Sequence, residues 1–430
     1  MSTRTAISRL LLLGFILTPI FGLQDWLEVM PAFNRYVNIE SQLLIKAMKD
    51  ILLAAILLLF VLDVLSGRPF LANPLIGLML SLALVAALIT SAGGKPFLAL
   101  IGLRSLSPLL LIFIGYNYLD MVFLKRLLRV LTFVFVLECC AATLQLVIGT
   151  PTNGRTFLNL TARPFGTFGN PWSLAAFICF VLCLRVGCDL YWHGRPKRTT
   201  QVFALVAAFF VYMTSSGAGV LTLAAMLIAY ILFLWRTHPY AKAAVVPALL
   251  LAPAVTFQNL ALLTGRQSVF NSARCRLEIL SEFLSSSGLK EMLIGRDMGT
   301  GSNAAVTFAH LSAATFGGAE TLFISDSLYV SVMSQAGFVF LLCFVVFNIL
   351  LFRKAIRERD YGINPMVVLM IPAVLVASLG NNVLELYPVN GLVCIIYGIA
   401  LKREHQPVGQ VVQIPESISA WHLRGCEGPA

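Results

Sequence analysis

The sequence predicts an all-α polytopic membrane protein of about twelve transmembrane helices, and its composition is the first reason. Hydrophobic residues make up 58% of the 430 residues and charged residues 12%, against roughly 25% charged residues in soluble domains. The apolar residues come in runs close to the roughly 20 residues with which a helix crosses a bilayer. This composition excludes a soluble enzyme and a disordered chain, and a β-barrel would show short segments of alternating polarity.

The expected spans follow one another within a single transmembrane domain, residues 1–401. Their approximate bounds are 7–23, 47–65, 74–91, 97–117, 130–149, 171–190, 201–215, 218–235, 244–262, 326–352, 366–383 and 388–401. The polar tail, residues 402–430, is expected to be flexible and cytoplasmic.

The basic residues predict the orientation of the chain. Lys and Arg total 31 against 20 acidic residues, a net charge of +11, and most of the basic residues cluster in short loops between the apolar runs. This is the positive-inside pattern, and it places both termini in the cytoplasm. The basic excess therefore reflects topology, and we expect no nucleic-acid partner.

Two outer loops stand out, at about residues 150–170 and 263–325. The first carries Arg155 and Arg163 without an acidic residue, and it has glycines at 166 and 169. A guanidinium offers a fork of donors that suits phosphate oxygens, and glycines let backbone N–H groups approach an anion. We expect an anion site here; the alternative is a surface turn whose Arg side chains touch lipid headgroups.

The second outer loop is predicted to carry an amphipathic helix at the membrane surface. Ala273, Leu277, Leu280 and Leu284 recur at helical spacing, with basic and acidic residues between them. Arg274 and Arg276 on this helix are candidate substrate ligands, although Arg274 can instead pair with Glu278 four residues on. Arg266, before the helix, has no obvious local partner.

Three further features lie toward the end of this loop. A glycine-rich turn, residues 293–303, contains Arg296 but lacks the Gly-Lys-Ser/Thr ending of a phosphate-binding loop. His310 is the one histidine expected outside, where it can serve acid–base chemistry or be merely solvated. Asp326 opens the tenth span, either as a helix cap or as a base that faces a cavity.

Two charged residues are expected inside the membrane, Arg104 in the fourth span and Glu138 in the fifth. An isolated charge there costs at least about 2.5 kcal/mol. We therefore expect these two side chains to pair across helices. The sequence has no Asp-x-Asp pair, so we expect no metal site.

In this order, these pieces resemble the superfamily of bacterial O-antigen polymerases and O-antigen ligases, over about residues 40–401. The motifs that carry the resemblance are Arg163-Pro-Phe-Gly-Thr-Phe-Gly-Asn-Pro171, Thr214-Ser-Ser-Gly-Ala-Gly219, the amphipathic Arg-rich helix, Ile294-Gly-Arg-Asp-Met-Gly-Thr-Gly-Ser-Asn303, Ser325-Asp-Ser-Leu-Tyr329 followed by Gly337, and Glu385-Leu-Tyr-Pro-Val-Asn390.

Within this resemblance, the motif at the tenth span favours a repeat-unit polymerase. The ligases carry His, then Asn, Ser or Gln, then nine residues and Gly, whereas this chain has Asp326 in place of the His before Ser327 and Gly337. Polymerases tend to show Arg, ten residues, then Gly in outer loops. Arg155 and Gly166 fit that spacing, and Arg276 and Gly288 exceed it by one residue. The Gly-Thr-Gly-Ser-Asn and Glu-Leu-Tyr-Pro forms look most like exopolysaccharide polymerases.

The resemblance implies a glycosyltransferase of the bacterial inner membrane that works at the periplasmic face without a metal or cofactor. Its donor and acceptor are glycans linked to a polyprenyl diphosphate, such as undecaprenyl diphosphate, and its product is exopolysaccharide or the O-antigen of lipopolysaccharide. Membrane lipid, a chain-length regulator and a flippase of the same pathway are the expected partners.

For the site, Arg163 and Arg266 are expected to stabilise the leaving diphosphate, and Asp326 to orient or deprotonate the acceptor. The further substrate-binding candidates are Arg155, Arg274, Arg276, Arg296, Glu320 and His310, the last two as reserve acid–base groups.

Two alternatives stay open. One is an O-antigen ligase-type transferase. The other is a transporter or flippase for lipid-linked glycans, which would place charges at the midplane on broken helices related by a repeat.

Overall fold

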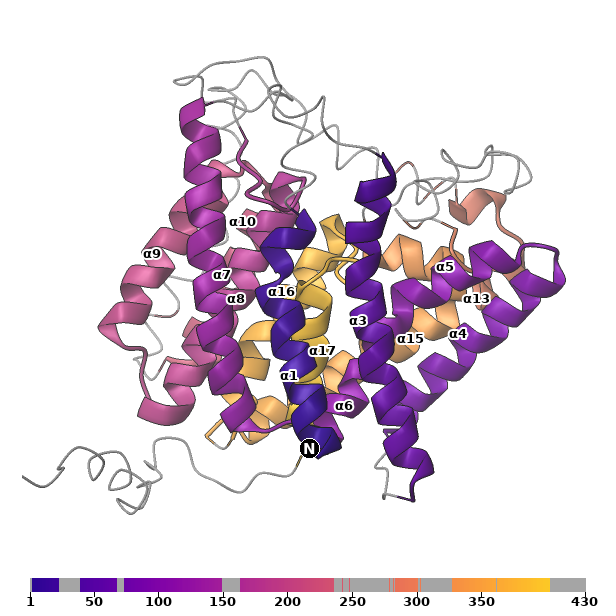
Figure 1. The fold of residues 1–430 in the computed structure, drawn as a ribbon, viewed down its shortest axis with the longest axis horizontal. Coiled ribbons are helices and arrows are strands. Elements are labelled where there is room, and N and C mark those ends of the chain that lie inside the picture. The colour runs from indigo at the N-terminus through magenta and orange to yellow at the C-terminus, as the bar shows by residue number, and fades with distance from the viewer. Residues whose placement is uncertain are drawn as a thin grey trace, which may run out of the picture.

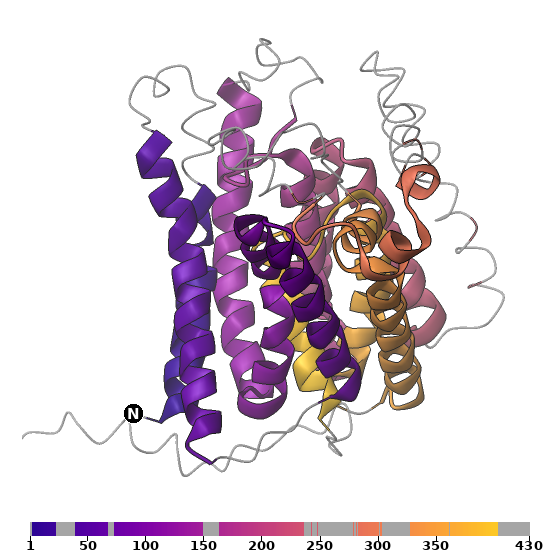
Figure 2. The ribbon, with the colours of Figure 1, turned by 90° about the vertical axis from the view of Figure 1, so that its right-hand side faces the viewer.

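A computed structural model describes residues 2–22, 39–67, 73–148, 163–235, 283–300, 327–360 and 362–402, together with single residues 242, 247, 278, 281 and 302. These residues are helical, with no strand among them, as Figures 1 and 2 show. The helices are α1 (Thr3–Ile16), α3 (Ile39–Leu65), α4 (Pro74–Ala92), α5 (Pro96–Leu106), the 3₁₀ turn η2 (Ser107–Leu109), α6 (Leu110–Tyr118), α7 (Met121–Ile148), α8 (Pro171–His193), α9 (Arg198–Met213), α10 (Gly217–Ala229), the π-turn η4 (Tyr230–Leu234), α13 (Leu289–Ile294), α15 (Leu328–Arg357), α16 (Asn364–Gly380) and α17 (Val389–Leu401).

The predicted class, a helical membrane protein, is confirmed. Within the described residues, six helical segments are long and apolar enough to cross a bilayer, and three more apolar helices are shorter. The six segments are Pro74–Ala92, Pro96–Tyr118, Met121–Val147, Pro171–His193, Gly217–Leu234 and Leu328–Arg357. The expected span 244–262 lies outside the described residues, apart from the single residue 247, so the count of twelve stays a prediction, as does the large outer loop.

The centre of the bundle is formed by α8, α16 and α17, around which the other helices pack (Figure 1). Glycines permit the closest contact, between α6 and α17. A Cβ atom on Gly398 would lie 2.1 Å from the Ile112 carbonyl oxygen, and one on Gly115 would lie 2.5 Å from the Ile395 carbonyl oxygen. Helices inside membranes depend on such small residues because close packing replaces the hydrophobic driving force available in water.

The two ends of the transmembrane domain meet at one turn between α6 and α7. Arg4, at the start of α1, pairs with Asp120, and Lys402, after α17, donates to the carbonyl oxygen of Leu119. The start of the first helix and the end of the last helix therefore lie on the same side of the bundle, here called the terminal face. The opposite side, here called the distal face, holds the C-terminal ends of α4, α7, α9 and α16 (Figures 1 and 2).

Two spans are interrupted inside the bundle. The span 96–118 is divided into α5 and α6 by η2, which contains Pro108. Helix α15 is kinked at Gly337, whose φ of 80° and ψ of 175° are not helical. Such breaks release backbone groups that need other partners. The α5–α6 break borders a cavity, and the Gly337 kink lies against the end of α13.

Because α6 and α17 touch through backbone, Gly398→Ala should lower stability by about 1–3 kcal/mol through overpacking. Gly77→Ala in α4 is the matched control, since nothing lies within 4 Å of its added Cβ atom, and it should be neutral or slightly stabilising. Thermal unfolding of the detergent-solubilised protein measures both. Equal melting temperatures for the two variants would contradict the described α6–α17 contact.

Candidate functional site

Of the predicted site residues, the structure describes Arg163 and Arg296. The positions of the others lie outside the described residues, and their roles stay predictions. These residues are Arg155, Arg266, Arg274, Arg276, His310, Glu320 and Asp326.

Arg163 joins two of the motifs noted in the sequence. Its Nε donates to the Thr214 carbonyl oxygen (2.9 Å) and its Nη2 to the Ser215 carbonyl oxygen (3.3 Å). These carbonyls follow the last turn of α9, where a cation is favoured by the helix dipole. The turn then reverses through Ser215, which has φ of 51°, and α10 begins after its cap, Ser216, whose Oγ accepts from Gly219 N–H (3.2 Å). Arg163 therefore fixes the loop before α8 to the α9–α10 turn at the distal face.

The loop that follows Arg163 enters the bundle and binds two side chains of α7. Gln145 Oε1 accepts from the N–H groups of Phe165 (2.8 Å) and Gly166 (2.9 Å), and its Nε2 donates to the Gly166 carbonyl oxygen (2.7 Å). Glu138 accepts from the N–H (2.8 Å) and hydroxyl (2.7 Å) of Thr167. One backbone N–H group, that of Thr167, donates to an anion here, and that anion is the protein's own Glu138 carboxylate. The N–H of Gly166 donates to the neutral Gln145 side chain instead.

Gly166 is required at this point for two reasons. Its φ of 57° is left-handed, and a Cβ atom would lie 2.3 Å from Glu138 Oε2. Glu138 itself is fully buried. The expected pairing of Glu138 with Arg104 is therefore wrong, because donors from the inserted loop satisfy the carboxylate instead. The positions of the two charges along their helices do not predict that this loop is the neighbour of Glu138.

The glycine-rich turn after α13 is likewise packed into the bundle. The N–H of Arg296 donates to the Ser334 carbonyl oxygen (2.9 Å), and that of Met298 to Thr90 Oγ1 (2.8 Å). The N–H of Gly299 donates to Gln335 Oε1 (3.2 Å). These three donors are thus engaged by α4 and α15, and they are not positioned as a phosphate cradle.

The Arg296 side chain also contacts protein groups. It forms an ion pair with Glu291 (3.3 Å), donates to Ser286 Oγ, and its Cζ lies 5.1 Å from the centre of the Phe283 ring. Next to it, Asp297 pairs with Lys95 Nζ at 2.7 Å. Together these contacts hold the turn against the α4–α5 hairpin.

The motif at the tenth span has a clear structural meaning. Ser327 caps α15, and its Oγ donates to the Ser378 carbonyl oxygen (3.2 Å). The nine residues that follow form the straight first part of the helix, which ends at the Gly337 kink. A Cβ atom on Gly337 would lie 2.1 Å from the Leu293 carbonyl oxygen. The spacing from Ser327 to Gly337 therefore sets the distance between the start of α15 and the kink against which the end of α13 packs.

A cavity of about 660 Å³ lies between α1, α3, the α5–α6 break, the start of α8 and the turn before α17. Its lining combines charged and polar side chains with aromatic rings, which suits a saccharide or a phosphorylated ligand. The charged and polar lining residues discussed below are Lys49, Asp50, Arg104, Asn170 and Glu385, and the aromatic ones are Phe15, Phe21, Phe168, Trp172 and Tyr387.

One ion pair crosses this cavity. Arg104 Nε donates to Asp50 Oδ2 at 2.9 Å, and each side chain is 37% exposed. Asp50, rather than Glu138, is thus the partner of Arg104. Lys49 Nζ lies 6.0 Å from the centre of the Tyr387 ring. Burial raises the pKa of the Tyr387 phenol, which stays neutral and donates to the Gly14 carbonyl oxygen.

The sequence reasoning missed Lys49 and Asp50. Both lie near the start of the second expected span, where adjacent charges are ordinary boundary residues. In the structure, α3 begins at Ile39, well before its apolar run, so Lys49 and Asp50 lie within the helix and not at its start. Glu385 and Tyr387 were noted only as part of a motif.

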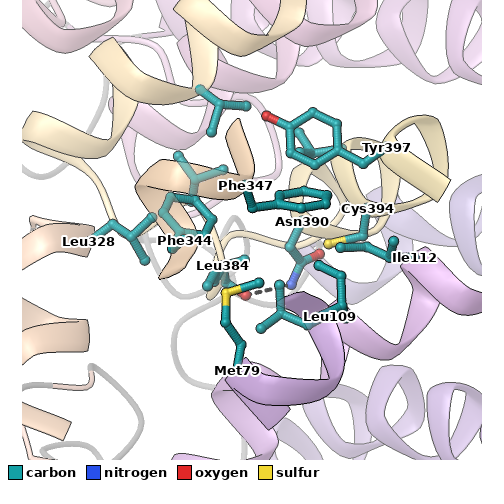
Figure 3. Close-up of a pocket in the computed structure, with 14 residues that line it drawn as sticks. Met79, Leu109, Ile112, Leu328, Phe344, Phe347, Leu384, Asn390, Cys394 and Tyr397 are labelled. Atoms are coloured by element: carbon teal, nitrogen blue, oxygen red, sulfur yellow. Dashed lines mark hydrogen bonds between the residues drawn. The ribbon is translucent and has the colours of Figure 1, made fainter. Parts of the chain in front are cut away.

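A second cavity, of about 10 Å³, lies deeper among α4, α6, α15, α16 and α17 (Figure 3). Its lining is apolar apart from Asn390 and Tyr397, whose polar atoms are engaged. Asn390 Nδ2 donates to the Leu384 carbonyl oxygen (2.9 Å), and the Tyr397 hydroxyl donates to Asn348 Oδ1 (2.7 Å). This space is too small and too apolar for a substrate.

Among the described residues, no group of three or more His, Cys, Asp or Glu side chains is placed to hold a metal ion. No known protein family matches the chain, and no curated protein is significantly similar to it.

Replacing Glu138 by Gln should release the inserted loop, because an amide group cannot accept both Thr167 donors. The lost charged hydrogen bonds are worth about 1.5–3 kcal/mol, so exchange of the Thr167 amide hydrogen should accelerate at least about tenfold. Mass-spectrometric hydrogen exchange in detergent measures this rate. Glu358→Gln, on the exposed end of α15, is the control. Unchanged protection of Thr167 in Glu138→Gln would contradict the described anchoring.

Proposed function

We propose that this protein is a glycosyltransferase that polymerises polyprenyl-diphosphate-linked oligosaccharide repeat units into exopolysaccharide or O-antigen. The observation that carries the proposal is the polar, aromatic-lined cavity inside an apolar helical bundle. The cavity reaches the start of α8, directly after the loop that Arg163 fixes at the distal face. A site for a lipid-linked sugar needs this combination, since its ligand is partly membrane-dissolved and partly polar.

Under this proposal the distal face is periplasmic and both termini are cytoplasmic, in a bacterial inner membrane. The terminal face supports this orientation because basic side chains gather there, as expected for cytoplasmic loops. The described residues at this face include Arg4, Lys125, Arg195, Lys197, Lys354 and Lys402.

The proposed reaction joins two lipid-linked saccharides. A hydroxyl oxygen of the acceptor attacks the anomeric carbon of the growing chain, and the bond from that carbon to the diphosphate oxygen breaks. The diphosphate leaves with the bonding electron pair, and the hydroxyl proton passes to a base. The donor is already activated, so the step needs no nucleotide, cofactor or metal.

In this scheme the Arg side chains stabilise the charge that develops on the diphosphate. Arg163 and Arg266 are the proposed principal groups, with Arg155, Arg274, Arg276 and Arg296 as further ligands. Asp326 is the proposed base, with Glu320 and His310 in reserve. Asp326 directly precedes Ser327 in the sequence. Ser327 lies at the start of α15, and its hydroxyl donates to the Ser378 carbonyl oxygen near the end of α16.

Arg163→Ala and Arg163→Lys should each lower polymer formation by at least about 100-fold, the usual effect of removing one preorganised donor. A lysine keeps the charge but lacks the planar fork of donors that suits phosphate oxygens. Polymer is measured in cells that lack the wild-type gene, alongside the membrane level of each variant. Full-length polymer from Arg163→Ala at normal protein level would remove Arg163 from the mechanism.

The two alternatives predict different glycans in a deletion strain. Loss of a polymerase should leave single repeat units on the lipid carrier, and that is the result we expect. A complete ladder retained on the carrier would identify a ligase-type transferase. Units trapped at the inner leaflet would identify a flippase. The observation that favours this alternative is the span 96–118, which is broken at η2 next to Arg104.

A further inference from the structure

The Arg104 guanidinium is only partly engaged by the protein. Among the described residues, the Nε contact with Asp50 is its one side-chain hydrogen bond, so neither terminal amino group has an acceptor within that part of the chain. A guanidinium carries five N–H donors, and in a cavity surrounded by apolar helices an unmet charged donor is costly. The cavity therefore has a cation whose remaining donors suit a ligand with several anionic oxygens.

Asp50 approaches this cation from a helix at the edge of the bundle. Helix α3 packs mainly on α1, with Ile51 and Leu58 exposed on its outer side and Leu52 and Ile56 lining the cavity. Near the other end of α3, Asp63 accepts from the Tyr118 hydroxyl (2.6 Å). A polar contact therefore attaches α3 to the bundle toward each of its ends, and the contact beside the cavity is the Asp50–Arg104 pair.

The charged side chains that line the cavity balance one another. Lys49 and Arg104 are balanced by Asp50 and Glu385, so Asp50 already supplies an anion to Arg104. The Asp50 carboxylate meets Arg104 through one oxygen, without the two parallel bonds of the strongest Arg–carboxylate pairs. A phosphate or diphosphate has more oxygens and more charge than a carboxylate, and it can replace Asp50 at the guanidinium.

We propose that Arg104 binds the phosphate or diphosphate headgroup of a lipid in the cavity, and that Asp50 occupies the anion position when no ligand is bound. The lipid tail would lie along the apolar face of α3. In the polymerisation described above, on which this identification rests, the ligand is the acceptor: its diphosphate does not react but must be held while its sugar attacks. Arg104 is then a second anion site, separate from the Arg163 loop.

The test is binding of farnesyl diphosphate to the purified protein in nanodiscs, with farnesol as the uncharged control. Arg104→Gln should weaken binding at least about tenfold, which corresponds to the loss of one charged hydrogen bond. Asp50→Asn should strengthen binding several-fold, because it removes the competing carboxylate and leaves the guanidinium. A pair with a purely structural role would instead make both substitutions equally harmful.

Two controls separate binding from folding. The double variant Asp50→Asn/Arg104→Gln keeps the cavity neutral and should fold without binding. Lys95→Gln and Asp297→Asn break an ion pair of similar length outside the cavity and should leave affinity unchanged. Nanodiscs with phosphatidylglycerol or with phosphatidylcholine alone identify the source of the headgroup: competition by phosphatidylglycerol indicates a bilayer phospholipid, and its absence a lipid diphosphate.

Wild-type affinity in Arg104→Gln, or equal losses in Arg104→Gln and Asp50→Asn, would overturn the proposal. The readout needs no polymer, so the two hypotheses fail separately. Loss of the Arg104 effect leaves the polymerase proposal standing, whereas a flippase-type glycan pattern with intact farnesyl diphosphate binding would leave the anion site standing.

Discussion

The structure depends on one constraint: inside a bilayer, polar groups must find their partners within the protein. Three acidic side chains show how the described part of the chain meets it. Glu138 accepts two hydrogen bonds from Thr167, Asp63 accepts from Tyr118, and Asp50 pairs with Arg104. Each contact joins segments far apart in the sequence. The same groups that are costly to bury therefore specify which segments lie together, while apolar packing against lipid-like neighbours is far less selective.

This constraint explains why irregular backbone enters the bundle at two places. The segments around Gly166 and Gly299 are not helical, so several of their N–H groups find their acceptors on other segments. Gln145 and Glu138 accept from the first segment, and Thr90 and Gln335 accept from the second. Both positions need glycine because a Cβ atom on Gly166 would lie 2.3 Å from Glu138 Oε2 and one on Gly299 would lie 2.4 Å from the Leu98 carbonyl oxygen. In both cases side chains of the bundle hold the backbone of the glycine-containing segment in place.

The sequence was informative about helices and much less so about contacts. Apolar run length predicts a helix because crossing a bilayer is a local requirement, and α4 and α8 fall where the runs predict them. Helix α7 ends as predicted but begins at Met121, well before the predicted start at residue 130. Pairing is not local. The sequence predicts that Arg104 pairs with Glu138, since these are the two charges singled out within the expected spans. The neighbour of α5 across the cavity is instead α3, whose Asp50 forms the ion pair with Arg104. Arg163 was identified as important from its motif, whereas its carbonyl partners in the α9–α10 turn had no signal of their own.

The proposed substrate, a lipid-linked glycan, accounts for the position of the cavity better than a free solute does. The polar lining lies behind α3, whose outer side is apolar and exposed, so a ligand that enters from the bilayer meets charge only after its tail is in place. Arg104 lies at the break between α5 and α6, and Arg163 lies beyond the start of α8, where Asn170 and Trp172 border the same cavity. A saccharide held between an anion site in the cavity and a second one at the loop would be fixed at its lipid end while its sugar end reaches the distal face. If both substrates carry a diphosphate, as the proposed polymerisation requires, each headgroup needs a cation, and Arg104 and Arg163 are the two that we propose for that role.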